Sequence, residues 1–82
     1  MQTLESADKQ TVQDALNALE EWKTTNPGAP LCVACGGYID FFGSATTPQE
    51  ILDSIQKEYG FAEPWEAADY ILRAELSEFS IH

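Results

Sequence analysis

Two adjacent glycines, Gly36 and Gly37, separate two short runs that are rich in strand-forming residues, Leu31 to Cys35 and Tyr38 to Phe42. A two-residue hairpin turn of type I′ needs a positive φ at both central positions, and glycine adopts this geometry without steric cost. The β-branched and aromatic side chains of the two runs suit a pleated surface. The segment therefore predicts an antiparallel β-hairpin.

One helix is predicted before this hairpin and another directly after it. The first runs from about Ala7 to Thr24, and it ends before Pro27, which disfavours helical geometry in the preceding residue. Its apolar stripe consists of Val12, Ala15, Leu16, Leu19 and Trp22. The second begins at a capping box, with Thr47 as N-cap and Glu50 at the third helical position, and it ends at Gly60. Its apolar stripe consists of Ile51, Leu52, Ile55 and Tyr59.

A third helix is predicted to start near Pro64. Its main apolar stripe is Trp65, Ala68, Leu72 and Leu76, widened by Ala67, Ile71 and Ala74. The tail that follows has two interpretations. Phe79 and Ile81 alternate with polar residues, which favours a third strand, whereas Phe79 also continues the helical spacing of Leu72 and Leu76.

The length of 82 residues predicts one domain over residues 1–82. We expect an α+β fold in the order α-β-β-α-α, in which a two-stranded antiparallel hairpin packs on helices and a third strand is possible at the C-terminus. No apolar run approaches the roughly 20 residues of a membrane span, and the N-terminal segment lacks the pattern of a signal peptide. We therefore expect a cytoplasmic protein with no membrane contact.

The charge is strongly unbalanced. Fourteen acidic residues oppose four basic residues, which gives a formal net charge of −10. Direct binding of nucleic acid is disfavoured, because phosphate contacts need clustered Lys and Arg. A basic protein surface is the favoured partner, because opposite potentials steer association. Acidity that serves solubility alone is the open alternative.

The string CVACGG, with Cys32 and Cys35, resembles one half of a zinc ribbon. A structural zinc site needs four ligands, usually Cys or His, and the chain has two Cys and one His, His82. Side chains three residues apart on a strand point to opposite faces, so the hairpin excludes a metal knuckle within one chain. We expect buried hairpin cysteines and no metal. A zinc shared between two chains and a redox dithiol are the alternatives.

The sequence contains few residues in arrangements that support catalysis. Nucleophile-and-base catalysis usually needs a positioned histidine, and His82 is the terminal residue. The glycine pair is not followed by the Lys and Ser or Thr of a phosphate-binding loop. We therefore expect neither enzymatic activity nor a cofactor.

Most carboxylates lack an obvious cation. The spacing of Asp53–Lys57 and Asp69–Arg73 predicts two helical ion pairs, which engage two of the four basic residues. The remaining acidic side chains are the predicted partner-binding surface, with Tyr70 as an exposed aromatic anchor off the main stripe of its helix. The candidates are Glu20, Glu21, Glu50, Glu58, Glu63, Glu66, Tyr70, Glu75 and Glu78.

These features predict a small acidic binding protein. It would inhibit or regulate a basic, nucleic-acid-binding enzyme by presenting carboxylates in place of phosphates. In size, acidity and lack of catalytic residues the chain is similar to counter-defence proteins of phages and plasmids, including anti-CRISPR and anti-restriction proteins. One alternative is a structural or assembly protein that homodimerises through the apolar face of the third helix. Another is a dimeric zinc-knuckle protein.

Overall fold

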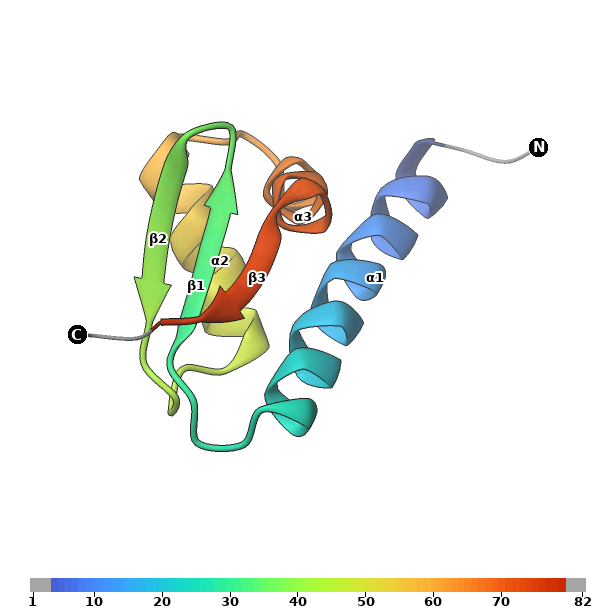
Figure 1. Cartoon of the computed structure of the whole chain (residues 1–82). Helices are drawn as coiled ribbons and strands as arrows, with labels where there is room; N and C mark the ends of the chain where they lie inside the picture. The colour runs from blue at the N-terminus through green and yellow to red at the C-terminus, as the bar shows by residue number, and fades with distance from the viewer. Residues whose placement is uncertain (1–3, 80–82) are drawn as a thin grey trace.

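The computed structural model describes the backbone of residues 4–79 and the side chains of residues 8–79. The helices are α1 (Leu4–Thr25), α2 (Pro48–Tyr59) and α3 (Pro64–Arg73), and the strands are β1 (Leu31–Cys35), β2 (Tyr38–Phe42) and β3 (Glu75–Glu78). The predicted α+β class and the order α-β-β-α-α are confirmed, and the third strand follows α3. In Figure 1, α2 and α3 lie behind the sheet and α1 runs beside α3.

The hairpin has the predicted two-glycine turn. Gly36 and Gly37 have φ values of 58° and 89°, the two positive values that a type I′ turn requires. The register pairs Cys35 with Tyr38 next to the turn. Because β3 pairs antiparallel with the other side of β1, the sheet order is β2-β1-β3 and β1 is the central strand.

Both ends of α2 follow the predicted signals. The Glu50 backbone N–H donates to Thr47 Oγ1 at 3.2 Å, and the Thr47 backbone N–H donates to Glu50 Oε1 at 3.0 Å. Gly60 ends the helix in the left-handed region with a φ of 68°. These local hydrogen bonds set where α2 begins and ends. The side of the helix that faces the core is determined by its apolar stripe.

One hydrophobic core lies between the helices and one face of the sheet. Leu31 and Val33 of β1 point into it, and α1, α2 and α3 each add two or three buried residues. The full set is Ala15, Leu19, Leu31, Val33, Ile51, Leu52, Ile55, Ala67, Ala68 and Ile71. None of the described helices covers the near face of the sheet in Figure 1. That outer face is therefore left to solvent or to a partner.

The buried face of α3 agrees only in part with the predicted stripe. Its buried residues are Ala67, Ala68 and Ile71, whereas Trp65 and Leu72 of the predicted main stripe are 37% and 43% exposed. The helix packs against both α1 and α2. The small side chains of the adjacent alanines allow α1 and α2 to approach α3 closely on two sides. The largest side chains of α3 therefore do not indicate which face is in contact.

The helix boundaries near both ends of the chain also differ from the expected ones. Helix α1 begins at Leu4 rather than Ala7. Helix α3 ends at Arg73, and Leu76, which was expected in the helical stripe, pairs with Val33 as a residue of β3. The backbone N–H and C=O groups on the free side of β1 need hydrogen-bonding partners. A strand can pair with them, whereas a longer α3 could not. The Phe79 N–H donates to the Pro30 carbonyl at 2.9 Å, whereas Ile81 and His82 lie outside the described residues.

Candidate functional site

The predicted partner-binding glutamates lie mostly on the surface. Those classed as exposed are Glu20, Glu21, Glu50, Glu58, Glu63, Glu75 and Glu78. They come from α1, α2, β3 and the segment before α3. Within the described residues, no three His, Cys, Asp or Glu side chains lie close enough together to hold a metal ion. The acidic residues therefore form a dispersed negative surface rather than one compact cluster.

Few of these carboxylates are neutralised by cations. Among the side chains of residues 8–79 one ion pair forms, between Arg73 Nε and Asp69 Oδ2 at 3.1 Å, as expected from the spacing. The other expected pair is not formed by these side chains, and Asp53 Oδ1 instead accepts a hydrogen bond from Gln49 Nε2 at 3.0 Å. Lys23 Nζ donates to the Ser44 carbonyl at 2.7 Å. Most of the negative charge therefore remains available at the surface.

Two of the predicted glutamates are engaged at helix starts. Hydrogen bonds from Thr47, chiefly its backbone N–H, hold the pKa of the Glu50 carboxyl below its ordinary value. Glu66 Oε2 accepts a hydrogen bond from the Glu63 backbone N–H at 2.9 Å where α3 begins. Because these two carboxylates already cap helices, the stronger candidates for partner contacts are the other exposed glutamates, Glu20, Glu21, Glu58, Glu63, Glu75 and Glu78.

Some of these stronger candidates lie at or near a hollow between α1 and β3. It has a volume of about 260 Å³ and is lined by Glu21 and Trp22 of α1 and by Leu76 of β3, among others. Glu20 adjoins Glu21 along α1. On β3, Glu78 pairs with Leu31 and shares the helix-facing side with Leu76, whereas Glu75 pairs with Ala34 and points to the outer face. We call Glu20, Glu21 and Glu78 the α1–β3 acidic face.

Tyr70 is not the exposed anchor that the sequence predicts. Its side chain is half-buried, and its hydroxyl is buried without a hydrogen-bonding partner. Its ring centroid lies 5.0 Å from that of Tyr59 and 6.0 Å from that of Phe61. The orientation of α3 about its buried alanines places Tyr70 in this aromatic cluster, where its ring packs against Tyr59 and Phe61.

Tyr59 connects the end of α2 to β2. Its hydroxyl donates to Asp40 Oδ2 at 2.5 Å, and its ring packs edge-on against Tyr38 with centroids 5.7 Å apart. The hydrogen bond to the Asp40 carboxylate raises the pKa of Tyr59 well above its ordinary value, and the nearby Tyr70 hydroxyl and burial add to this shift. The phenol stays protonated, and the Asp40 side chain is held on the helix side of the sheet.

The exposed large hydrophobic side chains concentrate on β2. Tyr38, Ile39 and Phe41 are 63%, 57% and 55% exposed. Ile39 and Phe41 pair with the outward-facing Ala34 and Cys32 of β1, so both point away from the core. Phe79 extends this surface, because its ring centroid lies 4.3 Å from that of Phe41. We call Ile39, Phe41 and Phe79 the outer-face patch.

The sequence analysis did not single out the outer-face patch as a binding surface. A signal was present, because β2 carries apolar side chains on both of its faces while helices usually cover only one face of such a small sheet. Large exposed apolar surfaces of this kind often mark interaction sites. The patch therefore joins the acidic face as a second candidate contact region.

The two cysteines lie on opposite faces of β1. Both are free thiols of intermediate exposure. Cys35 shares the helix-facing side of the strand with Leu31 and Val33, whereas Cys32 lies under Phe41 on the outer face. A zinc knuckle needs both sulfurs on one side of the chain, and the regular hairpin separates them.

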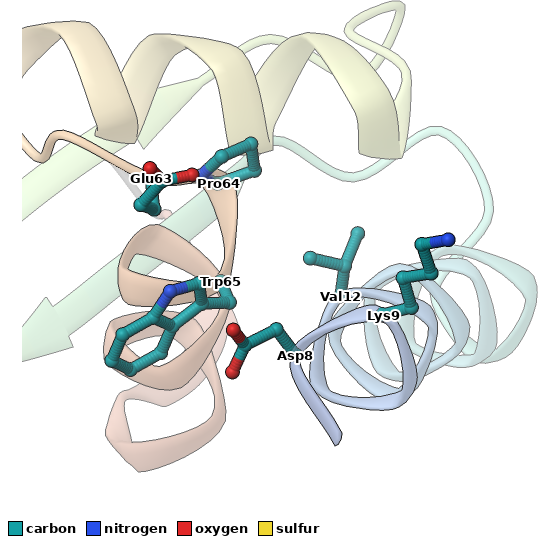
Figure 2. A pocket seen from close by; sticks show the side chains of 6 residues that line it. All are labelled: Asp8, Lys9, Val12, Glu63, Pro64 and Trp65. Carbon is teal, nitrogen blue, oxygen red and sulfur yellow. The ribbon is translucent and has the colours of Figure 1, made fainter. Parts of the chain in front are cut away.

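The cleft shown in Figure 2 lies between the first turns of α1 and α3 and has a volume of about 350 Å³. Its lining residues are Asp8, Lys9, Val12, Glu63, Pro64 and Trp65. The Asp8 carboxylate is directed toward Trp65, and Lys9 points away from it (Figure 2). Its six lining residues include no histidine, cysteine or serine, so this cleft offers a mixed polar and apolar surface rather than a nucleophile with its base.

No helix within the described residues is long and apolar enough to span a bilayer. Comparison of the chain with models of protein families, with curated proteins and with solved structures found no match.

Proposed function

We propose that this protein binds a basic, nucleic-acid-binding partner and inhibits or regulates it by presenting carboxylates in place of phosphates. The observation that carries the proposal is the exposure of the glutamates together with the near absence of internal neutralisation among the side chains of residues 8–79. Charges left at the surface of a folded domain with a net charge of −10 attract a positive surface over a distance of about one Debye length.

The α1–β3 acidic face is the proposed contact for the Lys and Arg side chains of the partner. Two of its glutamates project from a helix and one from an edge strand. Lys23, the basic residue nearest to this face in α1, directs its ammonium group to the Ser44 carbonyl. The face therefore presents several negative charges on a rigid scaffold, as a nucleic acid backbone does.

The proposal includes the setting in which the protein acts. It acts in the cytoplasm, without catalysis and without a cofactor, in the manner of a counter-defence inhibitor such as an anti-CRISPR or anti-restriction protein. The alternative is homodimerisation through the apolar face of α3, of which Trp65 and Leu72 are exposed and Ala67, Ala68 and Ile71 are buried in the core.

The test begins with capture of the partner. The immobilised protein is incubated with an extract of its native host, and bound proteins are eluted by raising the salt from about 0.1 M to about 1 M, which shortens the Debye length from about 10 Å to about 3 Å. We expect a basic nucleic-acid-binding protein that elutes with salt and that releases its DNA or RNA when this protein is added. A captured partner that keeps its nucleic acid contradicts the proposal.

Matched variants then separate local contacts from net charge. The variant Glu20→Gln/Glu21→Gln and the control Asp53→Asn/Glu58→Gln each change the net charge by +2, from −10 to −8. Asp53 and Glu58 are exposed on α2 and do not belong to the α1–β3 acidic face. We expect a loss of partner affinity of about tenfold or more for the first variant and a smaller loss for the control. Equal losses would show that the α1–β3 acidic face makes no specific contact.

A further inference from the structure

The strand β2 has an open edge. The sheet order β2-β1-β3 leaves one side of β2 unpaired among the described residues. In a hairpin with a two-residue turn, the residues that flank the turn exchange hydrogen bonds, and such pairs recur at every second residue. Here the flanking pair is Cys35 with Tyr38. The backbone N–H and C=O groups of Ile39 and Phe41 therefore point toward the open edge.

The same two residues carry the exposed apolar side chains. Ile39 is 57% exposed and Phe41 is 55% exposed, and both belong to the outer-face patch. An added strand gains affinity from main-chain hydrogen bonds and specificity from alternate side chains. Both contributions coincide at Ile39 and Phe41.

The usual protections of an edge strand are limited here. Natural edge strands often carry lysine, proline or a bulge that prevents pairing with other chains. The sequence of β2 is Tyr-Ile-Asp-Phe-Phe, and its pairing with β1 is regular over all five residues. The one charged residue is Asp40, which points to the helix side and is held there by Tyr59. The backbone edge beside Ile39 and Phe41 is thus accessible.

Charge decides which strand suits this edge. Antiparallel pairing of two β2 strands about Asp40 would place two carboxylates directly opposite each other, which destabilises a sheet. Each copy would also bring a net charge of −10. No Lys or Arg occurs between Lys23 and Lys57, so the whole hairpin lacks a positive side chain. A strand that carries its own Lys or Arg complements Asp40, whereas a second copy of this chain does not.

We propose that the open edge of β2 binds an extended segment of a basic protein as a fourth strand. The segment pairs with the backbone of Ile39 and Phe41, lays apolar side chains over the outer-face patch, and places a Lys or Arg beside Asp40. This inference rests on the proposed function for the charge of the partner, and it adds the binding surface and the conformation of the bound segment.

The test uses two synthetic probes with the same side chains. One is a peptide of about seven residues in which valine and lysine alternate, and the other has all its backbone amides N-methylated so that neither of its edges can donate the hydrogen bonds of a strand. Binding to the whole protein is followed by titration calorimetry and by amide chemical shifts. We expect the first peptide to bind in a salt-dependent manner with shifts at Ile39 and Phe41, and the N-methylated peptide to bind at least about tenfold more weakly.

Protein variants provide the matching control. Ile39→Thr/Phe41→Thr places a β-branched, strand-forming residue at both positions while removing apolar area, and we expect it to lose about tenfold in affinity for the unmethylated peptide. Leu72→Gln removes an exposed apolar side chain from α3, away from the edge, and we expect no loss. Equal losses in the two variants contradict the assignment of the site to β2.

The outcomes separate this inference from the proposed function. Equal, salt-dependent affinities for the two peptides contradict strand addition and leave the proposed function standing. If the unmethylated peptide binds more strongly than the N-methylated one and its affinity does not depend on salt, the result contradicts a basic partner but supports the site at the edge of β2. Binding of neither peptide contradicts strand addition, and the capture experiment then decides the proposed function. A dimer of the free protein in sedimentation experiments, lost in Ile39→Thr/Phe41→Thr, shows that the edge is occupied by a second copy and overturns the proposal.

Discussion

At the scale of single residues, two tyrosines in contact have opposite hydrogen-bonding states. The rings of Tyr59 and Tyr70 lie 5.0 Å apart between centroids. The Tyr59 hydroxyl donates to Asp40, whereas the Tyr70 hydroxyl is buried without a partner. A bonded hydroxyl stabilises a fold modestly, and a buried unbonded one costs free energy, so the same substitution has different consequences at these two positions.

Removal of the Tyr59 hydroxyl is expected to destabilise the fold. We predict that Tyr59→Phe lowers the free energy of unfolding by about 1 kcal/mol at neutral pH, measured by urea denaturation with tryptophan fluorescence. The folded state keeps the phenol proton to a higher pH than the unfolded state, in which tyrosine titrates at about pH 10. The stabilisation is therefore complete below about pH 10 and is lost as the pH rises through the raised pKa of Tyr59.

Two conservative variants test this assignment. Tyr38→Phe keeps the ring that packs on Tyr59 and changes an exposed hydroxyl, so its stability should equal that of the natural chain. Tyr70→Phe should cost nothing or stabilise the protein by up to about 1 kcal/mol, because no bond is lost. A loss in Tyr70→Phe as large as that in Tyr59→Phe would show that the Tyr70 hydroxyl has a partner.

At the scale of elements, predictability follows from how local the deciding interactions are. The start and end of α2 depend on Thr47, Glu50 and Gly60, which lie within the helix or next to it, and both were predicted correctly. The buried face of α3 depends on two neighbouring helices, and the stripe of large residues through Trp65 and Leu72 was the wrong guide. No turn signal in the sequence marks β3. This strand forms because it pairs with the free side of β1.

The local character of the α2 cap leads to a prediction for that element. Thr47→Ala removes the side-chain oxygen that accepts the Glu50 N–H, and it should lower the free energy of unfolding by about 1 kcal/mol. Thr47→Ser keeps the hydroxyl and should keep most of the stability. Thermal or urea unfolding followed by circular dichroism measures both. A serine variant as unstable as the alanine variant would mean that the methyl group, and not the cap bond, is important.

At the scale of the whole molecule, charge was visible in the composition, but its arrangement was not. The exposed glutamates were predicted correctly because acidic side chains are rarely buried. Tyr70 was expected to be exposed and is half-buried, because its exposure depends on the orientation of α3. The outer-face patch emerges only when the positions of the helices are known, since they show which face of the sheet stays uncovered.

The unneutralised charge predicts that salt stabilises the folded chain. Carboxylates lie closer together in the compact state than in the unfolded state, so screening relieves more repulsion in the folded protein. We expect Tm to rise when sodium chloride is increased from about 0.01 M to about 0.15 M, by about 4–8 °C for each 1 kcal/mol gained. Differential scanning calorimetry measures this change. Asp53→Asn/Glu58→Gln should show a smaller rise, and a fall in Tm with salt would indicate that attractive pairs dominate.

The separation of Cys32 and Cys35 across β1 has a consequence for handling and labelling the protein. Thiols that project from opposite sides of one strand cannot close a bridge within the chain without a change in the backbone. Air oxidation will therefore link separate molecules into covalent oligomers instead of cyclising one of them. Single-cysteine variants would turn this into a tool, because a dye on Cys32 would report on the outer surface of the sheet and a dye on Cys35 would report on the helical side.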